Sequence, residues 1–177
     1  MDWDVALFHS INGLAGQYPG LDAFMTALAD PGYFFIPGFL AVGYWIWQKR
    51  VQALAGVVVL AGLIVIVDLF GFQVKKLVAR PRPCQVLQEV NKVVGCGSTF
   101  SLPSNHAVNT ASVGIFFQLL YPKTGWIIWP VVILIGFGRV YVGAHYVTDI
   151  VAGWLLGGAF GWTVVSLLGR LSQKRIR

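Results

Sequence analysis

The chain has 177 residues, a length that suits a single domain covering residues 1–177. It is 56% hydrophobic and 11% charged, with a mean hydropathy of +0.70, which excludes an ordinary soluble protein and indicates a membrane protein. The net charge of +6 comes from Lys and Arg gathered in a few loops and not along one face, so we expect no nucleic-acid partner.

The first thirty residues carry apolar side chains at helical spacing on both sides of a break at Pro19 and Gly20. This pattern is typical of amphipathic helices that lie in the membrane interface, so we predict an N-terminal interfacial segment over residues 1–30. A sixth spanning helix would have to cross the break. Asp2 and Asp4 replace the basic residues of a signal peptide, so we expect no cleaved leader.

The rest of the chain predicts about five transmembrane helices, because its apolar runs approach the roughly 20 residues that cross a bilayer. The predicted spans are residues 33–48, 51–74, 105–121, 126–141 and 148–168. The predicted fold is therefore all-α, a polytopic membrane helix bundle of about five spans, six if the N-terminal segment crosses.

The distribution of Lys and Arg predicts an orientation with the N-terminus outside. The loops that this orientation places in the cytoplasm hold cations that belong to no other pattern: Lys49, Arg50, Lys123, Arg170, Lys174, Arg175 and Arg177. Most cations on the other side belong to polar motifs, so the remaining charge follows the positive-inside rule. We therefore expect the motifs to face the periplasm, across a bacterial inner membrane.

Three polar stretches interrupt the apolar chain: residues 75–83 (KKLVARPRP), 103–106 (PSNH) and 138–149 (GRVYVGAHYVTD). The predicted topology brings all three to the outer face, with residues 75–104 as an outer active-site loop. Their polar side chains are Lys75, Arg82, Ser104, His106, Arg139, His145 and Asp149. Two histidines, a carboxylate and fixed cations are typical of a phosphate site with nucleophilic or acid–base chemistry.

The order and spacing of these motifs resemble the signature of the type 2 phosphatidic acid phosphatase superfamily. The matching residues are Lys75 with six residues before Arg82-Pro83, then PSNH, then Arg139-x5-His145-x3-Asp149. The resemblance implies a membrane lipid phosphatase that works through a phosphohistidine. It implies His145 as nucleophile, Asp149 as the acid that orients it, and His106 as general acid and then base.

The same resemblance implies that Lys75, Arg82 and Arg139 hold the phosphate oxygens. Ser104 and Asn105 would add contacts at the start of a helix, where free backbone N–H groups favour an anion. Neither a metal nor another cofactor is expected, because the fixed cations provide the positive charge. The family commonly has Gly and Ser where this chain has Asn105 and Gly138; a backbone N–H at residue 105 would still serve.

Several alternatives stay open from the sequence. The lipid is undecaprenyl diphosphate, phosphatidylglycerol phosphate, lipid A 1-phosphate or phosphatidate, since all present a terminal phosphate. A headgroup-binding transporter or flippase would use the cations without a nucleophile, and a metal hydrolase would use both histidines and Asp149 as ligands. We expect the bilayer and a lipid phosphate as partners, and no obligate protein partner.

Five further residues outside the signature have two interpretations each. Cys84 and Cys96 are either bridged across the outer loop or free. Asp68 is expected to pair with Lys75 or with a polar group of a neighbouring helix. Arg80, like Lys76, is either an anchor at the headgroup level or an attractor of anionic substrate.

Overall fold

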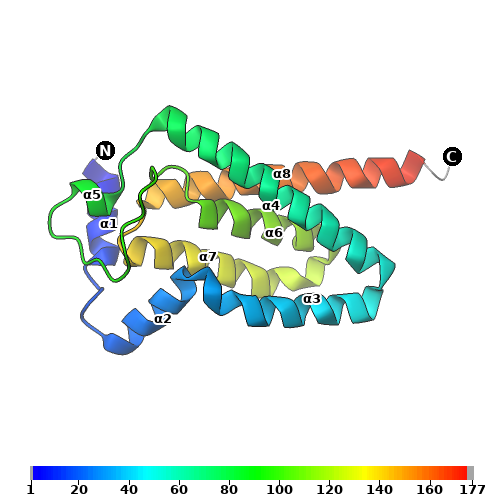
Figure 1. The fold of residues 1–177 in the computed structure, drawn as a ribbon, viewed down its shortest axis with the longest axis horizontal. Coiled ribbons are helices and arrows are strands. Elements are labelled where there is room, and N and C mark those ends of the chain that lie inside the picture. Colours follow the sequence, from blue (N-terminus) through cyan, green and yellow to red (C-terminus); the bar gives the residue numbers. More distant parts are fainter. Residues whose placement is uncertain (1, 175–177) are drawn as a thin grey trace.

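A computed structural model describes residues 2–174 as a bundle of helices, and no strand occurs within that range. In Figure 1 the long helices run roughly side by side, with the short α1 and α5 gathered at one end. The helices are α1 (Asp2–Asn12), α2 (Pro19–Ala29), η1 (Pro31–Phe34), α3 (Phe35–Lys49), α4 (Val51–Val78), α5 (Pro83–Val86), α6 (Asn105–Leu120), η2 (Pro122–Thr124), α7 (Gly125–Tyr141) and α8 (Val147–Lys174).

The N-terminal segment forms two short helices, as the break at Pro19 and Gly20 predicted. Each has 11 residues, or about 16 Å at 1.5 Å per residue, against a hydrocarbon core of about 30 Å. Neither helix is long enough to be a sixth span. α1 turns one face inward, where Asp4, Phe8 and Asn12 follow one another at intervals of four residues and are buried.

Five longer helices follow at the places where the sequence predicts spans. Three stretches are long and apolar enough to cross a membrane, at Val51–Val86, Pro122–Tyr141 and Val147–Arg170. α3 and α6 are shorter, with 15 and 16 residues. Large apolar side chains on α3 and α4 face outward, including Phe39 and Leu77. The fold is thus an all-α multi-pass membrane bundle.

Small residues bring α6 and α8 into close contact. A Cβ added at Gly157 would run into the carbonyl of Val108, and one at Gly153 would lie 2.7 Å from the Cβ of Ala107. Ser112 Oγ donates across the same contact to the carbonyl of Gly157 at 3.0 Å. Close backbone approach through Gly four residues apart is a common way to pack membrane helices. It fixes the start of α8 against the start of α6.

The loop after α4 differs from the prediction in one boundary. The predicted span ends at residue 74, but α4 continues to Val78 and so includes Lys75 in its last turn. Ala79 then ends the helix in a left-handed conformation, with its N–H bonded to the carbonyl of Lys75. Cys84 and Cys96 form a disulfide that closes the outer loop, with 6.0 Å between their Cα atoms.

The alternation of helix direction brings the three motifs to one end of the bundle. α4 and α7 end there, and α6 and α8 begin there (Figure 1). The turn between α3 and α4, which holds Lys49 and Arg50, comes at the other end of α4. Arg175 and Arg177, which the predicted orientation places in the cytoplasm, lie outside the described residues.

Candidate active site

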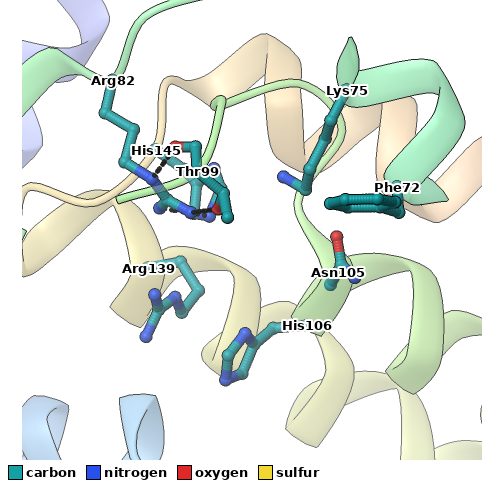
Figure 2. Close-up of a pocket in the computed structure, with 8 residues that line it drawn as sticks. All are labelled: Phe72, Lys75, Arg82, Thr99, Asn105, His106, Arg139 and His145. Atoms are coloured by element: carbon teal, nitrogen blue, oxygen red, sulfur yellow. Dashed lines mark hydrogen bonds between the residues drawn. The ribbon is translucent and has the colours of Figure 1, made fainter. Parts of the chain in front are cut away.

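A cavity of about 180 Å³ lies at the motif end of the bundle. Six of the eight predicted site residues line it, and they come from α4, the outer loop, α6, α7 and the turn before α8. Figure 2 shows Arg82 beside His145 and Thr99, and the guanidinium of Arg139 turned away from them. The lining residues are Phe72, Lys75, Arg82, Thr99, Asn105, His106, Arg139 and His145. The other two predicted residues, Ser104 and Asp149, are buried beside it.

The imidazole of His145 is buried and held from both sides. Nη1 of Arg82 lies 3.1 Å from its Nε2. A guanidinium can only donate, so Nε2 carries a lone pair and the proton is on Nδ1. Nδ1 lies 3.4 Å from Ser101 Oγ and 3.5 Å from Asp149 Oδ2. The Nδ1–H therefore lies between the serine hydroxyl and the carboxylate. Burial and the nearby guanidinium groups lower the pKa of His145 to about 3, which leaves a neutral ring whose Nε2 lone pair accepts from Arg82 at the cavity wall.

Asp149 is a fully buried carboxylate that accepts hydrogen bonds from several groups. Its Oδ2 accepts from the backbone N–H of Tyr146 at 2.9 Å and from the hydroxyl of Ser101. Its Oδ1 accepts from Nη1 of Arg80 at 2.7 Å. These contacts fix the carboxylate beside Nδ1 of His145, where it can stabilise an imidazolium that forms in the reaction.

Arg80 links this carboxylate to the N-terminal helix. Its guanidinium bridges Asp149 Oδ1 and Asp4 Oδ2, both at 2.7 Å, and lies 3.8 Å from the centre of the Tyr146 ring. Asp4 also accepts from the backbone N–H and the hydroxyl of Thr148. Arg80 is therefore an internal ion-pair residue and neither a headgroup anchor nor a free attractor of substrate. The repeat of Asp4, Phe8 and Asn12 was the sequence signal for a buried polar face on α1.

The ammonium group of Lys75 donates three hydrogen bonds to the loop that precedes α6. Its Nζ donates to the carbonyls of Phe100 at 2.9 Å, Ser101 at 3.2 Å and Pro103 at 2.6 Å. In this arrangement it positions the loop that carries Ser101 and Ser104, and it contributes positive charge to the cavity wall. Asp68 is not its partner.

Arg82 and Arg139 form the rest of the cationic wall. Arg82 is held by the carbonyl of Thr99 at 2.8 Å and its hydroxyl at 3.0 Å, and by the carbonyl of Ala144 at 3.1 Å. Arg139 donates through Nη1 to the carbonyl of Ala29 at the end of α2, at 2.9 Å. Its Nε is buried and has no partner among the described residues, so it remains available for an anion.

Ser104 and Asn105 stand at the start of α6, as predicted. Ser104 is the residue before the first helical turn, and its buried Oγ has no hydrogen-bond partner within residues 2–174. The amide nitrogen of Asn105 is occupied by Asp68 at 3.0 Å. Asp68 therefore occupies one of the two side-chain N–H groups of Asn105, and the backbone N–H stands in the first turn of α6. Unpaired donors on Ser104 and Arg139 are groups that the oxygens of a phosphate would satisfy.

A second cavity of about 760 Å³ adjoins the first and shares Asn105 and His106 with it. Its walls are mostly apolar and come from α2, α4, α6 and α7; Leu28, Val113 and Ile128 are among them. The ring of His106 thus separates a small cationic cavity from a large apolar one.

Within the described part of the chain, no three His, Cys, Asp or Glu side chains are grouped so that they could hold one ion. The sequence did not indicate Phe72, Thr99 or Ser101, because none belongs to the signature. Ser101 and Thr99 enter the site through loop geometry, and Phe72 lies one turn before Lys75 on α4.

Comparison with known proteins agrees with the resemblance that the motifs carry. The model of the PAP2 superfamily matches residues 38–173. The chain is 29% identical over 154 residues to the "Bacitracin transport permease protein BcrC" of Bacillus licheniformis, covering 87% of this chain and 75% of the relative. It is 29% identical over 168 residues to an "Undecaprenyl-diphosphatase" of Sulfolobus acidocaldarius, covering 93% and 78%.

The crystal structure of Aquifex aeolicus LpxE has the same fold. It superposes with a TM-score of 0.73 and 24% identity, over 92% of this chain and 94% of LpxE. The match to the family model, over residues 38–173, includes all three motif stretches. The chain belongs to the PAP2 superfamily and is a multi-pass membrane protein.

Proposed function

We propose that this chain is a metal-independent phosphatase that removes a terminal phosphate from a membrane lipid through a phosphohistidine at His145. The observation that carries this proposal is the neutral His145 ring at a cavity walled by three cations, with Nε2 next to Arg82 and Asp149 next to Nδ1. A site that only binds a headgroup needs the cations and has no use for a buried, oriented nucleophile. This favours hydrolysis over the transport alternative.

In the proposed first step, the Arg82 N–H that Nε2 of His145 accepts moves to a phosphate oxygen and frees the lone pair. Nε2 then attacks phosphorus, a P–N bond forms, and the P–O bond to the lipid breaks. The imidazolium that results is stabilised by Asp149 through the Nδ1–H. His106 lies across the cavity, at its border with the apolar cavity. It would protonate the departing lipid oxygen, a role that typically contributes about 10²–10⁴-fold in rate.

In the second step, His106 takes a proton from water, the water oxygen attacks phosphorus, and the P–N bond breaks to release inorganic phosphate. The charge that develops on the non-bridging oxygens is met by Arg82 and Arg139, and by the free hydroxyl of Ser104. Lys75 acts mainly by holding the loop, since its three donors are in use.

The large apolar cavity supports a lipid as the carrier of the phosphate. It begins at His106, where the leaving oxygen would lie, and continues between α4, α6 and α7. A volume of about 760 Å³ has room for the first part of a lipid chain. A small water-soluble phosphate ester would leave this volume unfilled.

We also propose that the site faces the outer, periplasmic side of a bacterial inner membrane. The Cys84–Cys96 bridge lies at the motif end, and disulfides persist in oxidising compartments. Lys49 and Arg50 lie at the opposite end of α4, where the positive-inside rule expects cytoplasmic cations. In this arrangement residues 1–30 are the interfacial segment, and residues 75–104 are the outer active-site loop.

The test is phosphate release by the purified protein from phosphatidate, phosphatidylglycerol phosphate, undecaprenyl diphosphate and lipid A, with EDTA throughout. We expect release from at least one lipid. His145→Ala should lower it by more than tenfold, because covalent catalysis is lost. His9→Ala, a histidine of α1 outside both cavities, is the matched control. Release that the His145 variant retains, or that EDTA abolishes, would overturn the mechanism.

Vanadate provides a second test, whose outcome does not depend on which lipid is the substrate. A five-coordinate vanadate resembles the transition state of phosphoryl transfer, so it should occupy the cavity between Arg82, Arg139 and His145 and inhibit turnover. Full activity in excess vanadate would contradict the proposed nucleophilic step.

A further inference from the structure

A polar cluster at the border of the two cavities is not used by the proposed chemistry. Asp68 on α4 accepts through Oδ1 from Nδ2 of Asn105 at 3.0 Å and from Nδ2 of Asn109 at 3.1 Å. All three residues line the large apolar cavity, and Asn105 also lines the cationic one. The sequence predicted a structural partner for Asp68 on a neighbouring helix, and this contact supplies it.

The hydrogen bonds decide which atoms the cluster presents. A carboxylate oxygen accepts, so the two amide nitrogens must face it and the two amide oxygens must face away. Oδ1 of Asn105 and Oδ1 of Asn109 are both buried, and neither has a partner within residues 2–174. Figure 2 shows the oxygen of Asn105 directed toward Phe72, at the edge of the cationic cavity. Each amide nitrogen has two N–H groups, and Asp68 accepts one of them, so the cluster presents two unpaired acceptor oxygens and one further N–H on each amide.

The position of these acceptors relates them to the leaving group. His106, which would protonate the departing oxygen, follows Asn105 in the chain, and Asn109 lies one turn further along the same face of α6. A leaving alcohol that passes from the cationic cavity into the apolar one must pass this face. Its first carbons then lie beside the acceptors, within a helical turn of the broken bond.

We infer that Asp68, Asn105 and Asn109 form a specificity subsite for a hydrogen-bond donor that the leaving lipid carries next to the scissile oxygen. A hydroxyl or an amide N–H on the adjacent carbon satisfies the buried acceptors, which are costly to leave unpaired. A glycerol headgroup supplies such a hydroxyl, and an N-acylated sugar supplies such an N–H. The inner phosphate of a diphosphate supplies only acceptors, and phosphatidate has no free donor there.

This inference rests on the proposed phosphatase function and narrows its substrate class. The test compares two synthetic lipids with the same leaving oxygen: phosphatidylglycerol phosphate and its 1,3-propanediol counterpart, which lacks the one hydroxyl. We expect kcat/KM to be higher for the hydroxylated lipid by about tenfold or more, because a site built to bind a hydroxyl discriminates strongly against its absence. Lipid A and undecaprenyl diphosphate, as third and fourth substrates, separate the amide source from the glycerol source and from a diphosphate.

A variant assigns the discrimination to the cluster. Asn109→Leu replaces the amide by an apolar group of similar size and should bring the ratio of the two kcat/KM values toward one. Val113→Ala, on the same helix and the same cavity wall, removes no acceptor and should keep the wild-type ratio. A role of Asn109 in folding alone would change the yield or stability of the protein but not this ratio.

The possible results are distinct. Equal kcat/KM for the two lipids in the wild-type protein would overturn the subsite while the phosphatase function stands. A ratio that Asn109→Leu leaves unchanged would also overturn it. Turnover of undecaprenyl diphosphate faster than the hydroxylated lipid would count against it in the same way. Absence of release from every lipid would refute the proposed function, and the subsite would fail with it.

Discussion

Replacing Arg80 by Met tests the most connected ion pair of the structure. The guanidinium lies 2.7 Å from Asp4 and 2.7 Å from Asp149, and both carboxylates are fully buried. Removing it leaves two buried negative charges. Asp4 keeps its contact with Thr148, and Asp149 keeps its contacts with Ser101 and Tyr146. Breaking one partner of a buried ion pair typically costs about 3–5 kcal/mol. Since Arg80 is itself 23% exposed and the carboxylates keep other donors, we expect about 3 kcal/mol.

For a domain of this size that loss corresponds to a decrease in Tm of about 6–12 °C, measured by thermal unfolding in detergent. We also expect phosphate release to fall by about tenfold or more, because Asp149 loses a donor that orients it beside His145. Lys76→Met, an exposed cation on the neighbouring turn, is the control and should change the free energy of unfolding by less than about 0.5 kcal/mol.

A second substitution in the same cluster separates charge from packing. Asp4→Asn in the Arg80→Met background removes one of the two uncompensated charges, so it should restore part of the lost stability. It should restore little activity, because Asp149 still lacks its arginine. The reasoning would be refuted if Arg80→Met unfolds and turns over like the wild-type protein, or if Asp4→Asn recovers activity as fully as stability.

Three further outcomes follow from other contacts. Because the pKa of His145 is lowered from 6.5 to about 3, His145 is protonated in the unfolded state but not in the folded state between these two pH values. The stability that this group contributes is therefore complete above about pH 6.5 and decreases toward pH 3. The free energy of unfolding should decrease by about 2 kcal/mol between pH 7 and pH 5. Unfolding measurements on His145→Gln at both pH values should not show this decrease. Reducing the Cys84–Cys96 bridge, which closes a separation of 12 residues, should lower the free energy of unfolding by about 3 kcal/mol; an unchanged Tm in dithiothreitol would argue against it. Gly157→Ala should destabilise the protein because the Cβ meets the carbonyl of Val108, whereas at Gly158 the nearest atom is 3.8 Å away, and equal Tm values for the two variants would contradict the packing.

Much of the architecture follows from hydropathy alone. An apolar run has to satisfy its backbone groups within itself in a bilayer, so the long runs become helices wherever they occur. The position of the N-terminal break was equally readable, because Pro19 begins α2 as a first-turn proline. The boundary at Val78 was not, because the left-handed Ala79 that ends α4 has no signature of its own in the sequence.

The site was predictable where residue type fixes chemistry. Histidines, a carboxylate and fixed cations in an apolar chain indicated a phosphate site, and the spacing of the motifs identified the family. Roles that depend on a partner far along the chain were missed. Arg80 is an example: its neighbours in sequence suggest a surface anchor, but its partners Asp4 and Asp149 lie 76 and 69 residues away.

By itself the sequence determined that this protein is a helical membrane protein, that its polar motifs gather at one end, and that they carry the chemistry of phosphate transfer. These conclusions rest on properties that each residue or run has alone: hydrophobicity, helical period, charge and acid–base character. The tertiary structure decided which atoms remain free. Hydrogen bonds to distant carbonyls occupy Lys75, and Asp68 binds the amide nitrogens of two asparagines, whose oxygens are left without a partner within residues 2–174. Such assignments depend on distances between segments, which a one-dimensional pattern does not contain.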